Sequence, residues 1–62
     1  MNEIINILMR RDGISREEAI ARCKECRRRL HEEAVPTGDY EEAIDIIAEE
    51  LGLEPDYMMY LL

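Results

Sequence analysis

A chain of 62 residues with a formal net charge of −7 and neither Phe nor Trp has little material for a large hydrophobic core. Because a domain of this length buries only roughly 60% of its unfolded surface, we expect one domain, residues 1–62, whose burial is completed by homo-oligomerisation. No apolar run is long enough to span a bilayer, and the two cysteines are too close in sequence to close a useful disulfide loop. These features exclude a membrane span and a disulfide scaffold, and they favour a cytoplasmic protein.

The charge is divided unevenly along the chain. All eight basic residues lie between Arg10 and Arg29; with five acids up to His31, this part carries a charge of +3. From Glu32 onward there are ten acids and no Lys or Arg, which gives a charge of −10. Packing of two oppositely charged helices, or association of subunits, satisfies such a division, so we expect ion pairs between the halves.

The first predicted helix covers about residues 2–11, and the following Asp12-Gly13 favours a helix stop. Its apolar positions recur at helical spacing and are Ile4, Ile5, Leu8 and Met9. A helix of about ten residues is not stable alone, because nucleation is costly. We therefore expect it to dock on the second helix or on another subunit.

The second predicted helix, about residues 16–34, is the longest. Ser15 with Glu18 three residues later has the pattern of a capping box, and Ile14 lies where an apolar staple belongs. At 100° per residue, one face of this helix carries a narrow apolar stripe, which consists of Ala19, Cys23, Cys26, Leu30 and Ala34. The helix is predicted to end because Pro36 disfavours helical geometry at Val35.

The third predicted helix covers about residues 40–51, with Asp39 and Glu42 as a second capping box. Its main apolar face comprises Tyr40, Ala43, Ile44, Ile47 and Leu51, and Ile46 widens this face on the opposite flank. The other side is almost wholly acidic, which suits packing against the arginine-rich second helix. Gly52, followed by Leu53, has the pattern of a left-handed helix ending.

A fourth helix is predicted over about residues 55–62, with Pro55 at its first position. Its last six residues, from Tyr57 to Leu62, are all apolar or aromatic and cannot all face the interior of so small a protein. Such a patch is typical of contact with another chain. The predicted fold is therefore all-α, with four helices, the second and third forming an antiparallel hairpin.

Cys23 and Cys26 have a C-x-x-C spacing, which occurs in redox-active cysteine pairs and in zinc sites, so both kinds of site are considered. A redox pair needs its first thiol at a helix start, but Cys23 lies about two turns inside the helix. Zinc needs four ligands, and His31 is the other soft ligand in the chain, so only a dimer could complete a zinc site. We predict small apolar core thiols, with no metal and no cofactor. Since Ser15 serves as a cap and His31 lies at a helix end, no catalytic residue is predicted.

Basic side chains on the second helix provide a candidate site for an anionic ligand. Guanidinium groups bind phosphate oxygens bidentately, and the candidates are Arg22, Arg27, Arg28 and Arg29. Binding to duplex DNA is not expected, because non-specific affinity depends on phosphate neutralisation and the chain is strongly acidic. A small anionic nucleotide at a subunit interface remains an alternative.

Two resemblances add to this picture. The segment Gly-Asp-Tyr-Glu-Glu-Ala-Ile from Gly38, with Leu30 before it and Pro55 after it, resembles one helical hairpin of a tetratricopeptide repeat over residues 30–55. The whole chain looks like the short helical proteins of bacteriophages and prophages, through Arg-Asp-Gly-Ile-Ser-Arg-Glu-Glu-Ala at residues 11–19 and Gly-Leu-Glu-Pro-Asp-Tyr at 52–57. The second resemblance implies an accessory protein that blocks a component of host defence in the bacterial cytoplasm.

The function expected from these features is a non-enzymatic, stoichiometric inhibitor of a host protein. An acidic helical surface would meet a basic patch on the partner through Glu41, Asp45 and Glu49. Apolar anchors would come from the last helix, through Tyr57, Met58, Tyr60 and Leu61. The alternatives are an oligomeric sponge for a cyclic or other anionic nucleotide signal, held by the arginines, and a purely structural or assembly role.

Overall fold

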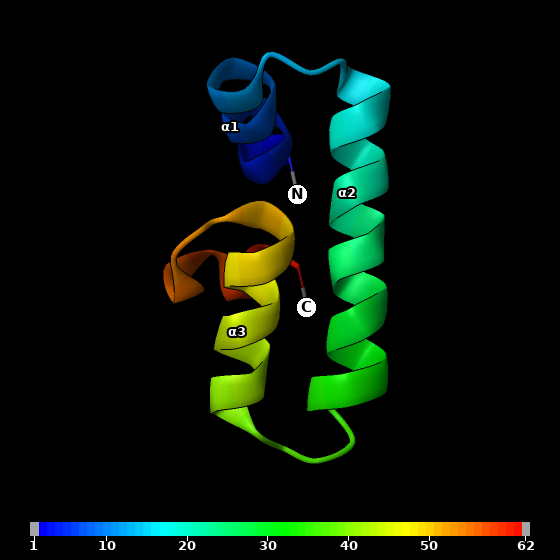
Figure 1. The fold of residues 1–62 in the computed structure, drawn as a ribbon, viewed down its shortest axis with the longest axis vertical. Helices are drawn as coiled ribbons and strands as arrows, with labels where there is room; N and C mark the ends of the chain where they lie inside the picture. Colours follow the sequence, from blue (N-terminus) through cyan, green and yellow to red (C-terminus); the bar gives the residue numbers. More distant parts are fainter. Residues whose placement is uncertain (1, 62) are drawn as a thin grey trace.

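The structure, a computed structural model, describes residues 2–61, and this part of the chain forms helices without any strand. The elements in chain order are α1 (Asn2–Asp12), α2 (Arg16–Arg29), η1 (Leu30–Ala34), α3 (Tyr40–Leu51) and η2 (Pro55–Tyr60). Figure 1 shows that η1 continues α2 as one long rod. The predicted all-α class and helical segments are confirmed.

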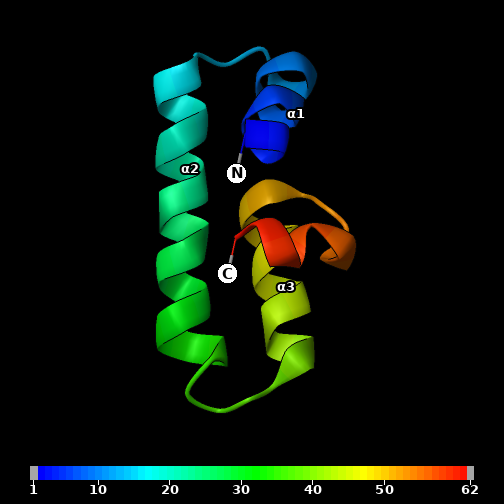
Figure 2. The same ribbon diagram turned by 180° about the vertical axis from the view of Figure 1, so that it is seen from behind.

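α2 and η1 run along the whole molecule, which measures 33 × 18 × 17 Å, and the other elements pack on one side of this rod (Figure 1). α1 covers the N-terminal half of α2, whereas α3 covers its C-terminal half and η1. α2 and α3 run in opposite directions, so the predicted antiparallel hairpin is present. Figure 2, seen from behind, shows η2 crossing α3 and returning the chain towards α2.

The core consists largely of the helix faces that apolar spacing predicts. The long rod contributes the whole predicted stripe, at most 4% exposed: Ala19, Cys23, Cys26, Leu30 and Ala34. The helices packed on it contribute Ile4, Ile5, Leu8, Ala43, Ile46, Ile47 and Leu51. α1 thus buries its apolar side chains against the long rod, which agrees with the expectation that a short first helix must dock to be stable.

Both predicted N-caps are present, but each lacks the reciprocal half of a capping box. Ser15 Oγ accepts a hydrogen bond from the Glu18 N–H at 3.1 Å, while the Glu18 carboxylate pairs with Arg22. Asp39 Oδ1 accepts from the N–H groups of Glu41 at 3.0 Å and of Glu42 at 3.3 Å. The Asp39 N–H donates to Thr37 Oγ1 instead of to a glutamate. At each helix start, the cap side chain therefore accepts from N–H groups of the first turn, but the glutamate three residues later does not accept from the N–H of the cap residue.

The end of the long rod differs from the prediction. Pro36 was expected to push Val35 out of helical geometry, but Val35 has φ −60° and ψ −46°, within the right-handed helical region. Its N–H donates to the Leu30 carbonyl at 2.8 Å, so the last turn, η1, is a π turn rather than the predicted α turn. The bias that a following proline places on Val35 is therefore overridden here, where Val35 extends the hydrogen-bonded helix by one residue.

The last helical segment also differs from the prediction. η2 is a 3₁₀-helix over Pro55–Tyr60, whereas the sequence predicts a helix over 55–62; Leu62 lies outside the described residues. The Leu61 N–H closes the final turn by donating to the Met58 carbonyl at 2.9 Å. The tighter 3₁₀ winding divides the apolar terminal run between the core and the surface.

Arg11 joins the end of α1 to the end of α3. Gly52 ends α3 in the left-handed conformation at φ +63°, as predicted, and its N–H donates to the carbonyls of Ile47 and Ala48. The Arg11 guanidinium donates to the Leu51 carbonyl at 2.6 Å and to the Gly52 carbonyl at 3.0 Å. A cation therefore satisfies the carbonyls at the negative end of α3.

Candidate functional site

The acidic residues predicted to meet a partner lie on α3. Glu41 and Asp45 are exposed, and neither takes part in an ion pair within residues 2–61. Glu49 differs, because its carboxylate lies 3.2 Å from the Arg29 guanidinium. The surface available to a cationic partner is thus centred on Glu41 and Asp45, at the end of α3 nearest the hairpin loop.

Three of the four arginines in the candidate anion site are neutralised by acids of the same chain. Arg22 pairs with Asp12 at 3.2 Å and Glu18 at 3.5 Å. Arg28 pairs with Glu25 and Glu32. Arg29 contacts three carboxylates, Glu33 at 3.0 Å, Glu50 at 2.9 Å and Glu49. The expected ion pairing between the halves of the chain is therefore present, through Arg29 on α2 and the acidic side of α3.

These pairs shift the titration of the acids that take part in them. Hydrogen bonding from Arg29 lowers the pKa of Glu33, and hydrogen bonding from Arg28 lowers the pKa of Glu25. Arg27 is exposed and forms no ion pair among the described residues, so it alone of the four remains available to an anion. One guanidinium does not form a phosphate-binding cluster.

The predicted apolar anchors are divided between surface and core. Tyr57 and Met58 are half-buried against the core, and Tyr60 is 46% exposed, with its ring 6.2 Å from that of Tyr57. Leu61 is only 1% exposed and belongs to the core. Its burial removes it from the predicted partner surface. Met59, which is not among the predicted anchors, is the most exposed side chain of this segment at 78%.

The two cysteines pack as apolar core residues. Both thiols are fully buried on the side of α2 that faces α1 and α3. Burial raises the pKa of Cys23, and it raises that of Cys26 to about 11, so both remain protonated thiols at neutral pH. Within residues 2–61, no three His, Cys, Asp or Glu side chains are grouped so that they could hold a metal ion.

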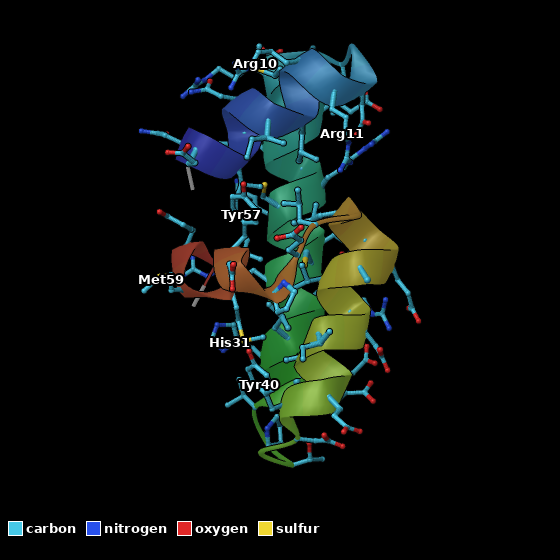
Figure 3. The ribbon with its side chains drawn as sticks, turned by 90° about the vertical axis from the view of Figure 1, so that its left-hand side faces the viewer. Arg10, Arg11, His31, Tyr40, Tyr57 and Met59 are labelled. Atoms are coloured by element: carbon cyan, nitrogen blue, oxygen red, sulfur yellow. The ribbon has the colours of Figure 1, made fainter. Side chains whose placement is uncertain are left out.

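A shallow hollow of about 170 Å³ lies at the loop end of the hairpin, between η1 and the start of α3. It is lined almost entirely by apolar surface, from Leu30, Ala34, Val35, Asp39, Tyr40 and Ala43. Tyr40, predicted to face the core, is instead 61% exposed at the rim, because it precedes the first buried turn of α3. Figure 3 shows Tyr40, His31 and Met59 on the same side of the molecule.

Comparison of the chain with protein-family models, with curated proteins and with solved structures found no match. None of the helices in residues 2–61 has the length and apolar character needed to cross a membrane. The candidate site therefore rests on the geometry of this chain alone: free carboxylates on α3, an apolar hollow between η1 and the start of α3, and exposed apolar side chains on η2.

Proposed function

We propose that the chain is a non-enzymatic protein that binds a partner protein stoichiometrically through the acidic surface of α3 and the neighbouring apolar side chains. The observation that carries the proposal is the position of Glu41 and Asp45. Both carboxylates are exposed and without ion pairs among the described residues, whereas Arg11, Arg22, Arg28 and Arg29 pair with other acids of the chain. Charge of this kind speeds encounter with a basic partner and selects against acidic ones.

Apolar contacts supply the affinity in this proposal. Met59 and Tyr60 on η2, and Val35 and Tyr40 near the hairpin loop, are the exposed large apolar side chains of the described residues. Aromatic and methionine side chains are enriched at protein interfaces, where they provide large contact areas. They replace Leu61 among the anchors expected from the sequence.

The biological context belongs to the same proposal. The resemblance to short bacteriophage proteins supports a role as an inhibitor of a host defence component in the bacterial cytoplasm. The small core supports association of the chain with itself, since a domain of this length buries little surface. The nucleotide sponge has less support, because Arg22, Arg28 and Arg29 are each paired with carboxylates of the same chain.

Affinity capture from a bacterial host lysate tests the proposal. The bait is compared with a variant that carries Glu41→Lys and Asp45→Lys, and with a matched variant that carries Glu3→Lys and Glu17→Lys. Both variants change the net charge equally, and all four glutamate or aspartate side chains are exposed. We expect a host protein retained by the bait and by the matched variant but lost from the α3 variant. Equal retention by all three baits would refute the proposal.

A further inference from the structure

Three basic side chains of α2 form a surface that lies outside the candidate site. Arg16, Lys24 and Arg27 are exposed, and none of them takes part in an ion pair within residues 2–61. At 100° per residue they fall within about 80° of one another, so they lie on one side of α2. Along the helix axis they extend over about 16 Å. We refer to this side of α2 as the basic face.

The sequence of α2 leaves the basic face without neutralising acids. Ion pairs along a helix join residues that are three or four apart. Arg22, Arg28 and Arg29 each have a glutamate at that spacing and pair with it. Along α2 and η1, no acid stands at that spacing from a residue of the basic face, although the chain contains 15 acids. Lys24 and Arg27 are themselves three apart, so their like charges repel and destabilise the helix slightly.

The basic face is on the side of the molecule on which η2 displays Met59. His31 is four residues after Arg27 and therefore lies on the same side of the rod. Figure 3 shows His31 and Met59 on the same side of the molecule. The other flank of α2 meets α3, because Arg29 pairs there with Glu49. The acids of α3 that reach the rod therefore leave the basic face open.

Apolar surface accompanies these cations. Ile20 lies between Arg16 and Lys24 on the same side of α2, and it is partly buried against the core. Its remaining surface is the apolar part of the basic face. Met59, at 78% exposed, adds apolar surface on the same side of the molecule. An occupant that fits this side combines negative charge with apolar side chains.

The distribution of the cations distinguishes among anionic occupants. A single phosphate needs several donors around one group, whereas these cations are spread over about 16 Å. A nucleic acid is a continuous polyanion, which the net charge of −7 repels at long range. A second copy of the chain brings the same net charge of −7 and is disfavoured for the same reason. A helical protein segment can present a few carboxylates along one side without a large total charge.

We propose that the basic face binds an acidic, amphipathic helical segment of a partner protein. Its carboxylates pair with Arg16, Lys24 and Arg27, and its apolar side chains contact Ile20. Binding relieves the repulsion between Lys24 and Arg27, because each cation gains a carboxylate. This surface is distinct from the acidic surface of α3, and the inference does not depend on the proposed function.

The probe is a short peptide of Glu and Leu at amphipathic helical spacing with one Trp, titrated with the full chain. Since the chain has no Trp, the fluorescence anisotropy of the peptide Trp reports binding without a dye. A second peptide has Gln in place of every Glu, which removes the charge and keeps the apolar side chains. We expect the Glu/Leu peptide to bind at least about tenfold tighter than the Gln/Leu peptide. Equal affinities would overturn the inference.

Variants of the chain locate the binding. Lys24→Gln with Arg27→Gln removes two charges from the basic face. The matched pair Arg10→Gln with Ala48→Glu lowers the net charge equally at exposed positions of α1 and α3. We expect the first pair to weaken binding of the Glu/Leu peptide about tenfold and the matched pair to change it by less than about twofold. Equal weakening by both pairs would mean diffuse attraction and would refute the site.

The same variant separates a binding role from a structural one. Because Lys24 and Arg27 repel each other in the unbound chain, Lys24→Gln with Arg27→Gln should leave the urea midpoint unchanged or raise it. A lower midpoint would show that the two cations stabilise the fold, and it would overturn the inference.

Two further measurements identify competing occupants. A single-stranded oligo(dT) that binds more tightly than the Glu/Leu peptide, and is lost after Lys24→Gln with Arg27→Gln, would assign the basic face to nucleic acid. An oligomer that dissociates in light scattering after the same substitutions would assign it to a second copy. Either result would overturn the inference. The lysate capture depends on Glu41 and Asp45 instead, so the proposed function and this inference fail separately.

Discussion

Replacement of Leu61 by Ala distinguishes a core role for this residue from the partner-binding role expected from the sequence. Leu61 is 1% exposed, against 78% for Met59 only two residues earlier. Leu→Ala substitutions in protein cores cost about 2–5 kcal/mol, which includes the cavity they leave. Because the adjoining η2 contributes no fully buried side chain and its residues can relax, we expect a cost of about 2–3 kcal/mol.

This cost is large compared with the stability of so small a domain. At about 0.05–0.15 kcal/mol per residue, a chain of 62 residues has a free energy of unfolding of about 3–9 kcal/mol. With a urea m-value of about 1 kcal/mol/M, Leu61→Ala should lower the urea midpoint by about 2 M. Met59→Ala is the control, and its exposed side chain should change stability by less than about 0.5 kcal/mol.

The assay is urea unfolding followed by circular dichroism for the parent chain and both variants. We expect a lower midpoint for Leu61→Ala alone, with an unchanged slope. If Leu61→Ala and Met59→Ala both unfold at the parent midpoint, Leu61 does not contribute to the core. The packing of the chain end between α2 and α3 would then be refuted.

Three further predictions concern the cap, the thiols and the ion pairs. Asp39→Ala removes the acceptor for two N–H groups of α3 and should cost about 1 kcal/mol in urea unfolding; an unchanged midpoint would show that the cap is dispensable. Cys26 should react with a thiol reagent only after unfolding, and because burial raises its pKa to about 11, stability should fall as the pH rises from about 9 to 11; rapid labelling of the native chain would contradict its burial. Arginine partners lower the pKa of Asp12 and Glu33, so the stability these carboxylates give is present above about pH 4 and is lost as the pH falls through their lowered pKa values. Thermal unfolding should therefore occur at lower temperature at pH 3 than at pH 5, and a constant melting temperature would contradict the pairing.

The helix faces could be predicted because they depend on local spacing. The apolar stripe from Ala19 to Ala34 on the rod needs only the helical period, and the end of α3 at Gly52 needs only the freedom of glycine at positive φ. The caps at Ser15 and Asp39 follow equally from short-range chemistry. These features require no knowledge of how the helices pack.

The arrangement of the terminal segment could not be predicted in this way. In a run of consecutive apolar residues, spacing alone does not determine which side chains turn inward. The 3₁₀ winding of η2 and its crossing of α3 place Leu61 in the core and Met59 outside. Both features depend on the space that α2 and α3 leave between them.

The candidate site was predicted in part. The acidic side of α3 follows from its sequence. Which of its carboxylates stay free of ion pairs depends on the register of the hairpin. This register brings Arg29 opposite Glu49 and Glu50 and leaves Glu41 and Asp45 free among the described residues. The hollow depends on the same register and on the π turn before Pro36. The helical spacing places Tyr40 on the core face of α3, whereas its side chain is 61% exposed, so the sequence carried no signal for the hollow.

Hydrogen–deuterium exchange of the captured complex tests most directly whether the loop end of the hairpin is the binding surface. Loop amides and first-turn amides of a helix exchange readily when exposed, so protection there reports a bound partner. We predict that binding slows exchange in residues 35–45, around the hollow and the free carboxylates, and leaves α1 unchanged. Protection confined to α1 and the N-terminal half of α2, with none in residues 35–45, would contradict the proposed surface.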